Sequence, residues 1–154
     1  MSDNRHRYHA MKNAFEQLCP TQPRGNFAWH LHTLAALVSG IVGSRSTQLP
    51  AIAAKVPDGI KKEGRVKRFS RWVNNGRIDV ETYFLPFADV LLDSLAAQGT
   101  LLLAMDGSEV GRKCLALMIS VIYQKRALPV ALIVVKGSKG HFPEETHLQL
   151  LQQV

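Results

Sequence analysis

The chain has 154 residues, of which 46% are hydrophobic and 20% charged, so it can bury a packed core and is not disordered over its whole length. Its formal net charge of +7 favours polyanionic partners, nucleic acid before anionic membrane surfaces. A basic surface that only keeps a protein soluble has the same charge, so the placement of the cations has to distinguish these classes.

Two helices are expected first. Residues 5–18 place apolar side chains at helical spacing, and a segment containing proline and glycine then breaks the pattern. Residues 26–42 carry a broad apolar face, which predicts a second, well-buried helix. Gly40, Gly43 and Ser44 mark the end of that helix.

A short helix and a basic helix follow, joined by a turn. The short helix is centred on Ile52 and carries Pro50 in its first turn. Residues 57–59, Pro-Asp-Gly, supply the turn. The basic amphipathic helix covers residues 61–74 and stops before Gly76.

Seven cations surround one acid, Glu63, in and beside the basic helix. The cations are Lys61, Lys62, Arg65, Lys67, Arg68, Arg71 and Arg77. A helix, a turn and a basic helix follow one another in a helix-turn-helix element, whose second helix enters the major groove of DNA while Lys and Arg hold phosphates. Arg65, Arg68 and Arg71 recur at helical spacing and could reach DNA from one side. A solvated basic face is the alternative.

The apolar side of the basic helix is predicted from the same spacing. Val66, Phe69 and Val73 share a face. Phe69 and Trp72 could be imagined as base-stacking residues, but aromatic side chains on the apolar side of a helix belong to the core, and we expect both there.

One more helix closes the helical half of the chain. Residues 81–97 have a helical pattern that Asp79 can cap, and Pro86 either kinks this helix or lies in its first turn. Residues 98–100, Gln-Gly-Thr, form the best domain boundary, which predicts a helical DNA-binding domain over residues 1–99.

Strands are expected after this boundary. The short apolar run 101–105 fits a fully buried strand, and residues 114–123 and 128–136 form an antiparallel hairpin. Residues 137–143 are a loop, and a helix begins at Glu144. The chain is therefore predicted to have an α+β fold, with three consecutive antiparallel strands and then a helix in its second half.

Asp106 is the candidate catalytic residue. It lies at the exit of the strand 101–105, where a rigid strand end could fix a carboxylate and leave it accessible. A Mg²⁺ site for phosphoryl transfer needs such hard oxygen ligands beside a phosphate. The alternative is that Asp106 and Gly107 form the turn of a hairpin.

The run LLLAMDGS at residues 101–108, with the two strands after it, resembles the start of the ribonuclease-H-like catalytic domain of DDE transposases. The segment RVKRFSRWVNN at residues 65–75 is similar to the region that precedes this domain in bacterial insertion-sequence transposases. The resemblance covers the chain from about residue 31 onward. It implies that residues 100–154 begin such a domain and that Asp106 is the first acid of its triad and a ligand of Mg²⁺.

The resemblance also implies a function. A full-length protein of this family would bind transposon ends as double-stranded DNA, as a homodimer in a synaptic complex, and cut and join DNA by metal-dependent phosphoryl transfer. The second Asp and the Glu of the triad would lie past Val154, so we expect an N-terminal fragment that is catalytically incomplete, because one carboxylate cannot hold two metal ions. Glu109, Glu144 and Glu145 are poor substitutes, since each falls in an expected loop or first helical turn.

Other metal sites are not expected. Cys19 and Cys114 lie far apart and read as reduced structural thiols. His30 and His32 flank one residue and cannot share a helical face, and His141 and His147 lie near a loop and a helix start, where solvated or hydrogen-bonded histidines are expected.

Two alternatives to a transposase remain. The first is a small DNA-binding regulator whose strands form a dimerising sheet. The second, a membrane-surface protein, is disfavoured because the basic helix has little exposed apolar area. The sequence has no signal peptide, and no apolar run approaches the roughly 20 residues of a membrane span. A cytoplasmic location is therefore predicted, and the resemblance to bacterial insertion-sequence transposases implies a nucleoid-associated protein of a bacterium.

Overall fold

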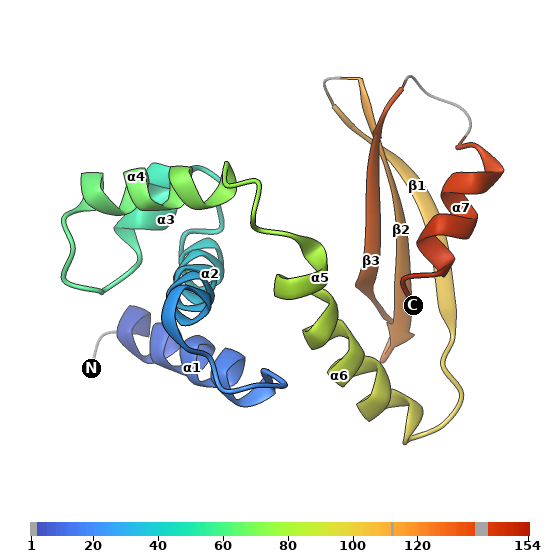
Figure 1. Cartoon of the computed structure of the whole chain (residues 1–154), viewed down its shortest axis with the longest axis horizontal. Helices are drawn as coiled ribbons and strands as arrows, with labels where there is room; N and C mark the ends of the chain where they lie inside the picture. Colours follow the sequence, from blue (N-terminus) through green and yellow to red (C-terminus); the bar gives the residue numbers. More distant parts are fainter. Residues whose placement is uncertain (1–2, 112, 138–141) are drawn as a thin grey trace. The chain divides into compact units, whose positions relative to one another are not determined.

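The computed structural model of the chain describes residues 3–111, 113–137 and 142–154. In these ranges it has seven helices and one three-stranded antiparallel sheet, the α+β class that the sequence predicts (Figure 1). The chain divides into two compact units, unit 1 (Met1–Tyr83) and unit 2 (Phe84–Val154). We expected the boundary near Gly99. It falls earlier because the helix before Gly99 packs on the sheet of unit 2.

Unit 1 is helical. Its helices are α1 (Asp3–Leu18), α2 (Gly25–Ser44), α3 (Leu49–Ala54), α4 (Lys62–Val73) and α5 (Val80–Tyr83). The helix α2 packs against α1, α3 and α4 and so forms the centre of the unit. Pro50 lies in the first turn of α3, as the sequence predicts.

The core of unit 1 joins α2, α3 and α4. Its buried cluster contains Ala36, Leu37, Ile52, Ala53, Val56, Phe69 and Trp72. Phe69 is fully buried and Trp72 is 9% exposed, which confirms that both belong to the core. The prediction for Val73 was wrong, because its side chain is 54% exposed and Trp72 occupies the core face at this end of α4.

Gly40 lies at the contact between α2 and α3. The helix ends at Ser44, one of the three residues predicted to mark its end, and Gly40 lies inside it. A Cβ atom at position 40 would lie 2.5 Å from Ile52 Cγ2 and 2.8 Å from the Ile52 carbonyl oxygen. The absence of a side chain at this position therefore allows α3 to approach the backbone of α2 closely.

The helix α2 also corrects the expectation about apolar runs. It has 20 residues, and a stretch of 18 of them has a mean hydropathy of 1.2, which is long and apolar enough to cross a membrane by length and composition alone. A core helix meets the same criterion, and α2 buries Leu31, Ala36 and Leu37 within unit 1.

Asp58 connects the turn before α4 to the helix itself. Its Oδ2 accepts a hydrogen bond from Arg68 Nη2 at 2.6 Å, and its Oδ1 lies 3.6 Å from Arg65 Nε. Oδ1 also accepts a hydrogen bond from the backbone N–H of Ile60 at 3.2 Å. The Asp58 side chain is 9% exposed, and burial together with this nearby carboxylate raises the pKa of Tyr8 on α1. One carboxylate thus fixes the turn and the rotation of α4 together.

Unit 2 consists of a sheet and two helices. Its elements are α6 (Leu85–Ala96), β1 (Leu103–Gly111), β2 (Cys114–Tyr123), β3 (Arg126–Lys136) and α7 (Glu144–Leu151). The strands are ordered β1-β2-β3 and all pairs are antiparallel, so the predicted hairpin is confirmed. The strand β3 begins earlier than expected, because Gln124 and Lys125 with φ of 47° and 64° make a two-residue turn.

A single helix over residues 81–97 was expected, and two helices are found there. Pro86 lies in the first turn of α6, one of the two positions considered for it. Asp79 caps α5 as predicted, with its Oδ1 accepting a hydrogen bond from the Thr82 N–H at 2.7 Å. Hydrogen bonding from Thr82 lowers the pKa of Asp79.

The core of unit 2 lies on one face of the sheet. Alternate residues of β2, Leu117, Ile119 and Val121, pack in one cluster with Ala88 and Leu95 of α6 and Leu150 of α7. Phe142 covers Gly107 on the same face, where a Cβ atom would lie 2.7 Å from its ring. The other face carries exposed apolar side chains, Leu132 at 46% and Val134 at 54%.

The pairing of Asp58 with two arginines leads to a first prediction. Asp58→Ala leaves two guanidinium groups, 14% and 19% exposed, without their carboxylate, and should lower the free energy of unfolding by about 2–3 kcal/mol. Chemical denaturation measures the change. The control is Glu63→Ala, which removes an exposed acid from α4 itself; equal losses from the two variants would contradict the role of Asp58.

Candidate nucleic-acid interface

The helix α4 has two fixed sides. Phe69 and Trp72 lie in the core of unit 1, and Arg65 and Arg68 face Asp58. Arg68 also lies over the ring of Phe69, with 5.1 Å between its guanidinium carbon and the ring centroid. The remaining side of the helix therefore has a defined set of residues.

The structure separates the seven predicted DNA-binding cations into two groups. Arg65 and Arg68 have side chains 14% and 19% exposed and share the Asp58 carboxylate, so both are held against unit 1 and one of their two positive charges is compensated there. The other five, which we call the exposed cations, are Lys61, Lys62, Lys67, Arg71 and Arg77. The expectation that Arg65 and Arg68 reach DNA beside Arg71 does not fit this arrangement.

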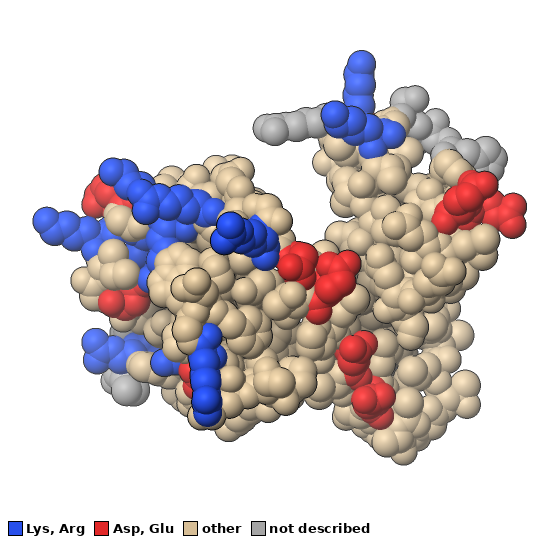
Figure 2. All heavy atoms as spheres, viewed as in Figure 1, with Lys and Arg blue, Asp and Glu red and all other residues tan. Residues whose placement is uncertain are grey.

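The exposed cations gather along α4 and at its two ends. Figure 2 shows Lys and Arg side chains covering the part of unit 1 where Figure 1 draws α4. Lys67 and Arg71 are one helical turn apart, and Lys62 and Arg77 lie toward opposite ends of the helix. Within the described residues, no ion pair within 4.0 Å engages these five side chains. Their charge is therefore directed to solvent and available to an anionic partner.

Asp106 occupies a position different from the one predicted. It lies inside β1, opposite Met118 of β2, and not at the end of a strand. The strand is largely exposed, so the expectation of a buried strand was wrong, and so was the alternative of an Asp-Gly turn. The pairing of β1 with β2 extends to Gly111, which leaves Asp106 in the ladder.

The neighbours of Asp106 follow from the strand alternation. Met105 and Gly107 point to the helix-covered face, so Asp106 points to the other face. There it shares the surface with Met118 directly opposite and with Leu132 of β3 beyond it. The carboxylate is exposed beside apolar side chains.

Other candidate metal ligands lie apart from Asp106. Glu109 belongs to β1 and not to a loop, while Glu144 and Glu145 form the first turn of α7 as expected. Among residues 3–111, 113–137 and 142–154, no three His, Cys, Asp or Glu side chains lie close enough together to hold a metal ion. Cys19 and Cys114 are not joined in a disulfide.

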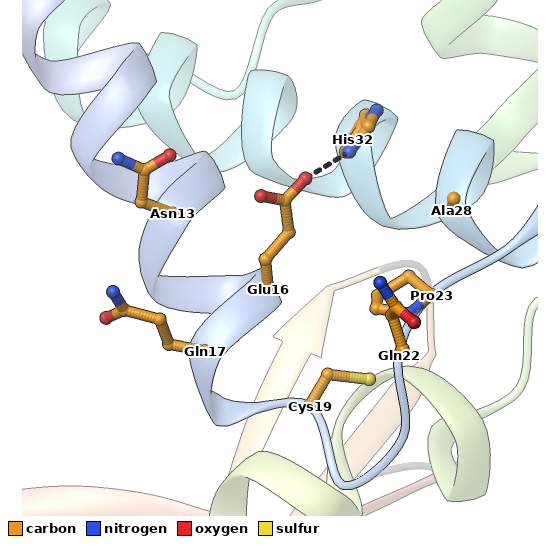
Figure 3. A pocket seen from close by; sticks show the side chains of 8 residues that line it. All are labelled: Asn13, Glu16, Gln17, Cys19, Gln22, Pro23, Ala28 and His32. Carbon is orange, nitrogen blue, oxygen red and sulfur yellow. Dashed lines mark hydrogen bonds and ion pairs between the residues drawn. The ribbon is translucent and has the colours of Figure 1, made fainter.

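The histidines make contacts within the protein. Figure 3 shows His32 on α2 and Glu16 on α1 pointing toward each other beside an open pocket of about 580 Å³, with His32 Nε2 at 2.7 Å from Glu16 Oε1. His147 Nδ1 lies 3.0 Å from the Pro143 carbonyl oxygen. The ring of His30 contacts that of Tyr83, and His141 lies outside the described residues. The pocket is thus bounded on one side by a hydrogen bond that joins two helices.

Sequence reasoning missed the role of Asp58. The residue was assigned to a turn, where aspartate is common for local reasons, and its turn hydrogen bond to Ile60 is present. The spacing in the sequence could have indicated this role. Arg65 and Arg68 are one helical turn apart, and an acid that precedes them across a turn can contact both guanidinium groups once the chain reverses direction. Helical periodicity alone assigned all three arginines to one surface.

Comparison of the chain with protein-family models, with curated proteins and with solved structures finds no match. The geometry of the two units therefore carries the functional interpretation.

Proposed function

We propose that this chain binds double-stranded DNA through the exposed cations of α4 and is the N-terminal part of a DDE-type transposase. The DNA-binding part of the proposal rests on how the cations in and beside α4 are divided between the fold and the surface. Two arginines are held by Asp58, while five cations along the same helix and at its ends remain unpaired within the described residues.

Duplex DNA is the partner that fits this surface. Phosphate contacts by Lys and Arg release condensed counterions, which is the main source of affinity for a polyanion of high charge density. The helix α4 has 12 residues and is therefore about 18 Å long, enough for its exposed side to lie in a major groove while the cations beside its ends approach the flanking phosphates. The order α3, turn, α4 is that of a helix-turn-helix element.

Unit 2 supports the transposase part of the proposal. Its order of strand, strand, strand and helix is the one that the resemblance to ribonuclease-H-like domains implies. Leu132 and Val134 are exposed on the face that carries Asp106, as expected if further chain covers this face in a complete catalytic domain. In this proposal Asp106 is the first acid of the triad.

Metal binding would need residues from outside this sequence. One exposed carboxylate is not a donor set for Mg²⁺, which takes several oxygen ligands in a fixed geometry, so the residues described do not fit the ion by themselves. No catalytic step is assigned to this chain alone. The second Asp and the Glu would come from later sequence, and the complete protein would act on transposon ends in the bacterial cytoplasm, at the nucleoid.

A small DNA-binding regulator is the second candidate. Leu132 and Val134 are exposed apolar side chains, and in a dimeric regulator a second copy of the chain would cover them. Both candidates use the same basic helix. In the regulator a second copy of the chain covers this sheet face, whereas in the transposase later residues of the same polypeptide cover it. Only the transposase would form a homodimer in a synaptic complex.

The proposed interface predicts how binding depends on salt. Replacing Lys67 and Arg71 with Ala should weaken binding to any duplex sequence and reduce the slope of log affinity against log salt concentration by about 2, because two phosphate contacts are lost. Fluorescence anisotropy with a labelled duplex at several salt concentrations measures both quantities.

The matched control removes the same charge elsewhere in unit 1. Arg5 on α1 and Arg24 before α2 are also exposed, and their replacement with Ala should leave the slope nearly unchanged. If the two double variants lose affinity equally, net charge and not α4 determines binding, and the assignment of the interface fails.

The transposase part is tested in the complete gene product. Asp106→Asn keeps the size of the side chain and removes its charge, so it should abolish Mg²⁺-dependent strand cleavage, with duplex affinity unchanged. Glu109→Gln, on the same strand, is the control and should cleave normally. Undiminished cleavage by the Asp106 variant would dismiss this residue as a metal ligand.

A further inference from the structure

The side of α4 that faces away from the core carries a stripe of polar residues. About 100° of rotation per residue places them together, nearly opposite Phe69. The stripe consists of Glu63, Lys67, Ser70, Arg71 and Asn74. All are exposed except the half-buried Ser70, whose carbonyl oxygen accepts a hydrogen bond from Asn74 Nδ2 at 2.7 Å.

This stripe contains acidic, basic and uncharged polar side chains, whereas a surface that bound only phosphates would be basic throughout. The carboxylate of Glu63 lies one helical turn before Lys67, in the first turn of α4. Phosphates repel a carboxylate, so Glu63 weakens a purely electrostatic interface. In the described ranges no ion pair within 4.0 Å involves Glu63, so Lys67 does not neutralise it directly.

Base edges, unlike phosphates, present both donors and acceptors. In the major groove the N4 amino group of cytosine donates hydrogen bonds, which a Glu carboxylate can accept. Guanine presents the acceptors O6 and N7, to which Lys and Arg donate hydrogen bonds. The N-terminal residues of the second helix in a helix-turn-helix element are those that contact base edges. Glu63 has this position in α4.

The rotation of α4 keeps this stripe pointing outward. Asp58 holds Arg65 and Arg68 on one side, and Phe69 and Trp72 are packed in the core. A helix fixed in this way presents the same positions to the duplex each time it binds, which is a condition for discriminating between base pairs.

We propose that Glu63 is a specificity-determining residue that accepts a hydrogen bond from the amino group of a cytosine in the major groove, while Lys67 and Arg71 contact neighbouring guanines or phosphates. The proposal rests on the proposed DNA binding through α4. It assigns the stripe to base recognition and the cations at the ends of the helix, Lys62 and Arg77, to phosphates.

A structural role of Glu63 gives a different expectation. An acid in the first turn interacts favourably with the helix dipole and needs no contact with DNA. Removal of Glu63 would then leave sequence preference unchanged and raise affinity for all duplexes equally, because one repulsive charge is gone.

The test is selection from a pool of random duplexes by the wild-type chain, Glu63→Ala and Glu63→Gln. The wild type should enrich cytosine at one fixed position by about tenfold or more, and Glu63→Ala should lose the preference at that position alone. Glu63→Gln should shift it toward adenine, which Gln recognises. Glu81→Ala, which removes an exposed first-turn acid from α5, should select the wild-type sequence. Melting curves establish that each variant is folded.

The outcomes separate this inference from the function on which it rests. A selected sequence that is identical for wild type and Glu63→Ala overturns the role of Glu63 and leaves DNA binding intact. Salt-dependent binding by the wild type without any enriched sequence also overturns the role of Glu63 and leaves DNA binding intact. A wild-type chain that retains no duplex at low salt overturns both.

Discussion

The contacts of Asp58 with two arginines of α4 determine which residues unit 1 presents on its surface. A carboxylate 9% exposed accepts from Arg68 at 2.6 Å and lies 3.6 Å from Arg65, so two of the seven cations in this region serve the fold. Removing one partner of such a largely buried group is costly, because the remaining charges lose their compensation. The rotation of α4 and the identity of its exposed residues follow from this pairing and from the burial of Phe69 and Trp72.

The two units divide the proposed function between them. In unit 1 the helix α4 carries the charge that would hold a duplex, and in unit 2 a three-stranded sheet carries the exposed carboxylate of Asp106. One face of that sheet is packed by α6 and α7, and the other exposes Leu132 and Val134. Apolar side chains exposed on the same face as an acid are what a catalytic domain would have before its remaining elements are added, which is why we propose a transposase and not an isolated regulator.

Local patterns predicted much of the fold, and contacts distant in sequence account for the misses. The helices α1 to α4, the hairpin of β2 and β3 and the core positions of Phe69 and Trp72 follow from periodicity and turn residues. Periodicity could not reveal that Asp58 pairs with Arg65 and Arg68, because the pairing depends on how the turn folds back. It also could not show that β1 extends through Asp106, since strand length is fixed by pairing with β2.

The central claim is that α4 presents its exposed cations to duplex DNA while Arg65 and Arg68 stay with Asp58. An amide-resolved NMR titration of the chain with a short duplex tests it most directly. The account predicts that the largest shifts occur at Lys67, Arg71 and their exposed neighbours on α4, and that the Asp58 turn changes little. Shifts confined to α1 or to unit 2, or a spectrum that the duplex leaves unchanged, would contradict it.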